Sequence, residues 1–137
     1  MRAQFLVAGF FLSLAAIPAQ GETVSLGAHL LGGYAVPANK SDAFGEGQFT
    51  YDSATGTLDY YITYDGIAPS KIDLHGPAGP GATAPALLAF PSGETPISGT
   101  VTLTKSQADS LLAGSLYMDM HSPAYADGEI RGQIRKE

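Results

Sequence analysis

Glycine and proline interrupt this chain too often for it to form long helices. The 137 residues include 17 glycines and 9 prolines, and both residue types end or break regular helical structure. The segments between them are short, and in many of them apolar and polar residues alternate, which is the pattern of a half-buried strand. The sequence therefore predicts an all-β fold, a Greek-key-like sandwich or barrel of about eight strands with one short helix.

The local patterns place these elements along the chain. The clearest is an antiparallel hairpin of residues 45–51 and 57–64, joined by a turn in which Gly56 can adopt positive φ. The helix is predicted to follow Thr104, because Gln107 three residues later completes a capping box. The expected strands cover residues 23–30, 45–51, 57–64, 70–75, 86–90, 97–103, 115–121 and 128–134.

The N-terminal residues have the features of a secretory signal peptide. Arg2 precedes an apolar run over residues 5–17, which is shorter than the roughly 20 residues that a membrane-spanning helix needs. Small residues precede Glu22, so we expect cleavage before this residue. The chain is thereby divided into a signal peptide, residues 1–21, and a β domain, residues 22–137. This division predicts export to the periplasm or the extracellular space.

Charge and composition limit the partners that this protein can bind. The formal net charge is −6 at pH 7, which disfavours association with nucleic acid or anionic lipid. The chain contains no cysteine, which excludes disulfides and thiol nucleophiles. We expect no nucleic-acid partner and no membrane span, and a partner that is either an unidentified protein or a metal ion.

Two segments repeat the pattern Asp-x-His. The first holds Asp73 and His75, and the second holds Asp119 and His121. Residues i and i+2 of a strand share one face, so the members of each pair should lie side by side. The alternating residues are apolar and should face the core, which leaves the Asp and His pairs pointing outward. If the two strands are neighbours, all four side chains converge on a shallow exterior site.

Three segments resemble the chordin-type (CHRD) domain. Residues 71–78 (KIDLHGPA) resemble its HIHGPA segment, residues 116–121 (LYMDMH) resemble its LYVNVHT segment, and residues 128–134 (GEIRGQI) match its closing GEIRGQ strand. The resemblance is to the single-domain, exported bacterial form of the family. It implies a β-rich binding or interaction module. Asp73 replaces the first His of the family segment and Asp119 replaces its Asn, so both changes introduce a carboxylate.

Three functions are open at this point. The first is an exported, non-enzymatic binding or interaction module, as the resemblance implies. The second is a metal-binding protein, because imidazole combined with carboxylate suits zinc or copper; its ligands would be His75, His121, Asp73 and Asp119. The third is a metal-dependent redox enzyme. We assign no catalytic residue, because the chain has no nucleophile elbow, no H-E-x-x-H and no phosphate-binding glycine loop.

Structural roles compete with each functional one. His75 and His121 each precede a turn containing proline, and their rings can hydrogen-bond to backbone groups that lack ladder partners there. Glu129 and Arg131 share a strand face and are expected to form a structural ion pair. His29, on a separate early strand, is expected to be an ordinary half-buried residue.

Overall fold

The structure of this protein is a computed structural model that describes Gly9 and residues 21–137. The predicted signal peptide, residues 1–21, lies outside the described residues apart from Gly9 and Gly21. Among the described residues, no helix is both long and apolar enough to cross a membrane.

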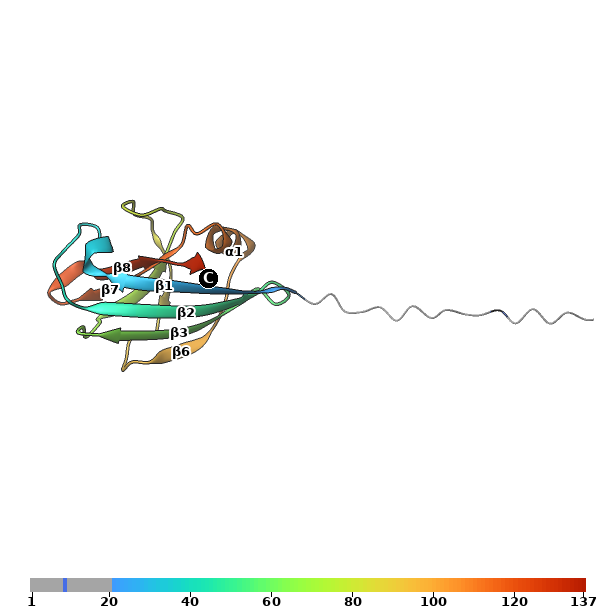
Figure 1. The fold of residues 1–137 in the computed structure, drawn as a ribbon, viewed down its shortest axis with the longest axis horizontal. Helices are drawn as coiled ribbons and strands as arrows, with labels where there is room; N and C mark the ends of the chain where they lie inside the picture. Colours follow the sequence, from blue (N-terminus) through green and yellow to red (C-terminus); the bar gives the residue numbers. More distant parts are fainter. Residues whose placement is uncertain (1–8, 10–20) are drawn as a thin grey trace, which may run out of the picture.

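The strands form one antiparallel sheet, in the order β5-β4-β7-β8-β1-β2-β3-β6, and β9 pairs with β1 (Figure 1). This architecture, a curled half-barrel with one short helix, confirms the predicted all-β class. In chain order the elements are β1 (Thr23–Leu31), the 3₁₀ helix η1 (Gly32–Tyr34), β2 (Phe44–Asp52), β3 (Thr57–Asp65), β4 (Lys71–His75), β5 (Ala86–Phe90), β6 (Ile97–Thr102), α1 (Lys105–Leu112), β7 (Tyr117–Ser122), β8 (Tyr125–Gln133) and β9 (Arg135–Lys136).

The predicted hairpin is the pairing of β2 with β3. Its register runs without a break from Phe44 opposite Asp65 to Asp52 opposite Thr57, and Gly56 in the turn has a φ of 70°. Buried and exposed residues alternate along both strands, as a sheet with one covered face requires. The alternation of apolar and polar residues that predicted these strands therefore results from the burial of one face of the sheet.

The short helix α1 begins as its sequence indicates. The backbone N–H of Gln107 donates to the Thr104 hydroxyl oxygen at 3.2 Å, and the backbone N–H of Thr104 donates to Oε1 of Gln107 at 2.9 Å. The predicted capping box is thus present. The apolar side of the helix is anchored by Leu111, which is fully buried.

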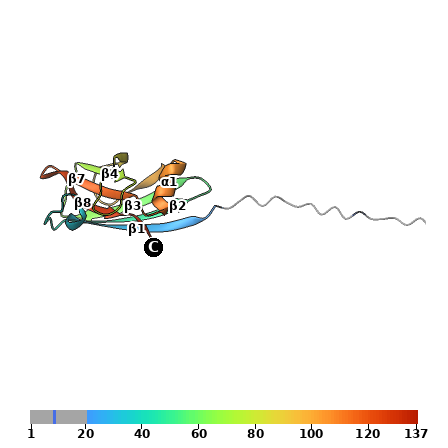
Figure 2. The same cartoon turned by 90° about the horizontal axis from the view of Figure 1, so that it is seen from above.

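The sheet curls so that one face encloses the core. Tyr60 on β3 meets Phe90 on the edge strand β5 edge to face, with ring centroids 4.9 Å apart, although these strands lie near opposite ends of the sheet. In the view of Figure 2, β4 and β7 lie on the opposite side of the fold from β1. The enclosed aliphatic side chains include Leu26, Leu30, Leu58, Ile62, Ile72, Leu74, Met118, Met120 and Ile130. Each contributes about 1.5–3 kcal/mol by leaving water.

The seam between β1 and β8 depends on the absence of a side chain at Gly132. A Cβ built at this position would overlap the backbone carbonyl oxygen of His29. Backbone of a paired strand cannot shift without disturbing the ladder, so only glycine fits there.

We predict that Gly132→Ala lowers the free energy of unfolding by about 2–4 kcal/mol, because the added methyl group forces β1 and β8 apart. Gly79→Ala is the matched control, since a Cβ there meets nothing within 4 Å. The control should change stability by less than about 1 kcal/mol. Urea titrations of the two variants and the parent protein measure the difference, and equal midpoints would contradict the assignment.

Candidate metal centre

The pairing of β4 with β7 brings the two Asp-x-His segments together. Asp73 lies directly opposite Asp119, and His121 lies opposite Lys71. Residues Leu74 and Met118 of the same strands are fully buried in the core, so the acidic and imidazole side chains occupy the other face of the sheet. In both segments the Asp and the His lie on one face of their strand, as predicted, and the two strands are neighbours.

The four side chains form one compact cluster. One ligand atom from each of Asp73, His75, Asp119 and His121 lies within 4.8 Å of the others. Nε2 of His75 lies 3.0 Å from Oδ1 of Asp119, and Nε2 of His121 lies 3.1 Å from Oδ2 of the same carboxylate. Oδ2 of Asp73 is 3.7 Å from Nε2 of His75 and 4.0 Å from Nε2 of His121. We call this group of four residues the Asp–His cluster.

Both imidazole rings are oriented by backbone carbonyl groups. Nδ1 of His75 lies 2.8 Å from the carbonyl oxygen of Ala84, and Nδ1 of His121 lies 2.7 Å from that of Ala126. A carbonyl oxygen only accepts, so each Nδ1 carries a proton and donates it. The backbone contacts that a structural role predicts are therefore present, although the Ala126 carbonyl belongs to β8 and not to a turn. They use only one nitrogen of each ring.

The other nitrogen of each ring faces a carboxylate. In a neutral imidazole protonated at Nδ1, Nε2 carries a lone pair. In His75 this lone pair points at Oδ1 of Asp119, and in His121 Nε2 lies 3.1 Å from Oδ2 of the same carboxylate. Like electron density then meets unless a positive charge lies between the two groups. Nε2 of His121 is buried and has no hydrogen-bond partner in the described part of the chain. Either a second proton on each ring or a bound cation can supply the missing charge.

The cluster is more enclosed than the sequence suggests. We predicted a shallow exterior site, but the Asp73 side chain is only 2% exposed and that of Asp119 only 12%. The reason is tertiary: the loop of residues 76–85 folds over the outer face, and the hairpin between β7 and β8 meets His121 from the other side. The side chains thus point away from the core, as expected, but are covered by loops.

Two basic residues modify the charge of the cluster. Nζ of Lys71 lies 3.0 Å from Oδ2 of Asp73, and more than half of the lysine side chain is exposed. Hydrogen bonding to Asp73, together with the negative charge of this carboxylate, raises the pKa of Lys71. Burial lowers the pKa of Arg131, although the charges of Tyr117 and Asp119 oppose this effect. Lys71 therefore interacts with the cluster from its solvent side and Arg131 from within the fold.

Tyr117 connects the cluster to its covering loop, and the sequence interpretation did not single it out. Its ring stacks on His75 with centroids 4.9 Å apart and an interplanar angle of 5°, and the guanidinium carbon of Arg131 lies 3.5 Å from the ring centroid. The Tyr117 hydroxyl accepts from the backbone N–H of Ala84 and donates to its carbonyl oxygen. The alternation of side chains along the strand could have identified Tyr117, because it lies two residues before Asp119 and therefore shares its strand face.

Two expectations about neighbouring residues were wrong. Glu129 and Arg131 form no ion pair within 4.0 Å: the Glu129 carboxylate accepts from the hydroxyls of Ser41 and Ser122, whereas Arg131 donates to the carbonyl oxygen of Gly79. The physical reason is that two serine hydroxyls and a loop carbonyl satisfy the two groups separately. His29 is not half-buried, since its side chain is 81% exposed and lies 3.6 Å from a Glu46 oxygen.

Comparison with known proteins identifies the family. The CHRD domain model matches residues 26–134, which is most of the chain, so this protein belongs to the CHRD family. The family resemblance of the three sequence segments is confirmed, and membership supports a binding or interaction module. No curated protein and no solved structure matches the chain.

Substitutions at Tyr117 should separate its stacking from its hydrogen bonds. Tyr117→Phe keeps the ring between His75 and Arg131 and should cost about 1 kcal/mol of stability. Tyr117→Leu also removes the stack and should cost about 2–4 kcal/mol. Urea unfolding measures both values, and amide hydrogen exchange over residues 76–85 should accelerate more in the Leu variant. Equal exchange in the two variants would contradict a role of the stack in holding the loop.

Proposed function

We propose that this protein is an exported, non-enzymatic binding module whose ligand is a divalent zinc or copper ion held by the Asp–His cluster. The observation that carries the proposal is the orientation of the two histidines. Each donates from Nδ1 to a backbone carbonyl and places Nε2 3.0 or 3.1 Å from an Asp119 carboxylate oxygen. Metal-binding histidines in proteins are commonly fixed in this way, with the second ring nitrogen donating to an outer partner.

The spacing of the cluster supports a small tetrahedral ion. Zinc–nitrogen and zinc–oxygen bonds of about 2.0–2.2 Å place neighbouring tetrahedral ligands about 3.4 Å apart. The four nitrogen–oxygen separations in the cluster run from 3.0 to 4.0 Å and bracket this value. Modest side-chain rotation within the cluster is enough to accommodate an ion.

The ligand types and the charge favour zinc or copper over calcium or magnesium. Two imidazoles and two carboxylates form a mixed nitrogen–oxygen set, whereas calcium and magnesium select oxygen ligands alone. The two buried carboxylates balance the charge of one divalent ion. Their attraction offsets the desolvation cost of enclosing the ion. The methionines of β7 do not contribute, because Met118 and Met120 lie on the core face.

Binding is favoured over catalysis by the enclosure of the cluster. All four residues can act as protein ligands, and sites with four protein ligands are typical of structural zinc, while catalytic zinc keeps a position open for substrate. The cavity that borders Asp119 measures about 40 Å³, which is room for about one water molecule. Export is supported by the signal-peptide pattern of residues 1–21.

Addition of zinc to metal-depleted protein should stabilise the fold. At a free ion concentration of 100 times Kd, the free energy of unfolding should rise by about 2.7 kcal/mol, because the ion binds the folded chain only. Calorimetric titration with zinc sulfate and with copper sulfate should give one ion per chain. His75→Gln and His121→Gln should each weaken binding by more than the roughly 10- to 100-fold that loss of an outer partner costs.

His29→Gln is the matched control, since this exposed histidine lies on β1 outside the cluster. It should leave the affinity for both ions unchanged. If neither ion alters thermal unfolding of the parent protein, or if His29→Gln weakens binding as much as His75→Gln does, the proposed site is wrong.

Lys71 should compete with the ion for Asp73. Removal of its ammonium group in Lys71→Met frees Oδ2 of Asp73, so zinc affinity should rise by roughly two- to fivefold, the range of an exposed ion pair. Lys105→Met is the control, because Lys105 forms a comparable exposed ion pair with Asp109 on α1. Calorimetry of both variants tests this point, and an unchanged affinity in Lys71→Met would show that the lysine does not oppose the ion.

A further inference from the structure

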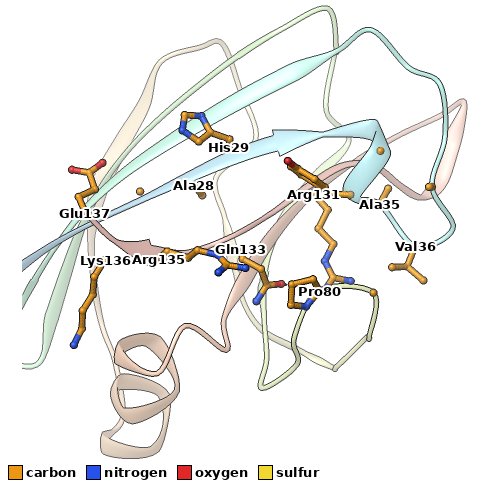
Figure 3. Close-up of a pocket in the computed structure, with 15 residues that line it drawn as sticks. Ala28, His29, Ala35, Val36, Pro80, Arg131, Gln133, Arg135, Lys136 and Glu137 are labelled. Carbon is orange, nitrogen blue, oxygen red and sulfur yellow. Dashed lines mark hydrogen bonds between the residues drawn. The ribbon is translucent and has the colours of Figure 1, made fainter.

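A second concave site lies on the outer face of the sheet, apart from the Asp–His cluster. Its volume is about 840 Å³, within the roughly 300–1,000 Å³ of sites that bind small molecules. Residues of β1, β8 and β9 form the floor, and the walls are the loop after β1 on one side and Pro80 and Gly81 on the other (Figure 3). No member of the Asp–His cluster lines this site. We call it the cationic groove.

The groove concentrates positive charge on an acidic protein. Arg131, Arg135 and Lys136 line it, although the whole chain has only seven lysines and arginines and a net charge of −6. None of the three forms an ion pair within 4.0 Å with any described residue. Figure 3 shows Gln133 between the guanidinium groups of Arg131 and Arg135. The one acidic side chain among the lining residues belongs to Glu137. The groove therefore attracts an anion.

The walls of the groove are apolar and stable in position. Tyr34 and Val36 rank among the exposed large hydrophobic residues of the described chain, at 57% and 37%. Their loop is fixed by Asn39, whose backbone N–H donates to the Gly32 carbonyl and whose side-chain amide donates to the Glu129 carbonyl. The opposite wall is held by the bond from Arg131 to Gly79. A preformed groove loses little entropy when it binds a ligand.

We infer that the cationic groove binds a small organic anion with an apolar body, such as an aromatic or aliphatic carboxylate or sulfonate. Arg135 would pair with the anionic group, and Tyr34 and Val36 would contact the apolar part. The volume suits one molecule of drug-like size. The groove shares no lining residue with the Asp–His cluster, so this binding does not require the metal ion.

Two fluorescent probes with the same aromatic body test the inference. 1-Anilinonaphthalene-8-sulfonate carries a sulfonate, and N-phenyl-1-naphthylamine is its neutral counterpart. Titrated into the purified protein in metal-depleted buffer, the sulfonate should bind in a saturable manner, with at least about tenfold higher affinity than the amine. Its affinity should fall as salt is added, because the exposed cations are screened.

Variants locate the bound probe. Arg135→Gln should weaken sulfonate binding about fivefold or more and leave binding of the neutral amine unchanged, whereas Val36→Asp should weaken both. Lys105→Gln, which removes a cation on α1 outside the groove, should change neither. Thermal unfolding of each variant checks that the fold is retained. Equal affinity for the two probes, absent sulfonate binding, or equal effects of Arg135→Gln and Lys105→Gln would overturn the inference.

Discussion

The antiparallel pairing of β4 with β7 is the constraint on which the rest of the site depends. In its register, Asp73 lies opposite Asp119 on one face, while Leu74 and Met118 lie in the core on the other. A slip of one residue in both strands would expose the apolar side chains and bury the cluster in the core. Burial of each apolar side chain contributes about 1.5–3 kcal/mol. The core therefore fixes the register of the two strands, and the register fixes the positions of the polar side chains on the other face.

The two nitrogens of each histidine serve separate purposes in this arrangement. Donation from Nδ1 satisfies a backbone carbonyl, that of Ala84 before β5 or that of Ala126 near the start of β8. The same bond fixes the ring, and so directs Nε2 toward the carboxylates. A structural role and a ligand role are therefore compatible in one side chain. The sequence presented these roles as alternatives, but each uses a different nitrogen of the ring.

Aromatic stacking joins the Asp–His cluster to the cationic groove. His75, Tyr117 and Arg131 form a continuous stack across β4, β7 and β8. One end of this stack belongs to the Asp–His cluster, and the guanidinium at the other end lines the cationic groove. The stack also carries the bonds that hold residues 76–85 against the sheet. The loop of residues 76–85 thus both covers the Asp–His cluster and forms one wall of the cationic groove.

Local patterns in the sequence determined the elements of this protein. Alternation predicted the strands, the capping box predicted the start of α1, and parity placed Asp73 and His75 on a common face, because these features depend only on residues close in the chain. Tertiary structure decided the rest. The strands β5 and β6 and the helix α1 separate β4 from β7 in the chain, and their pairing results from closure of the whole core. The burial of Asp73 and the separate partners of Glu129 and Arg131 likewise depend on distant loops, whose positions no local pattern encodes.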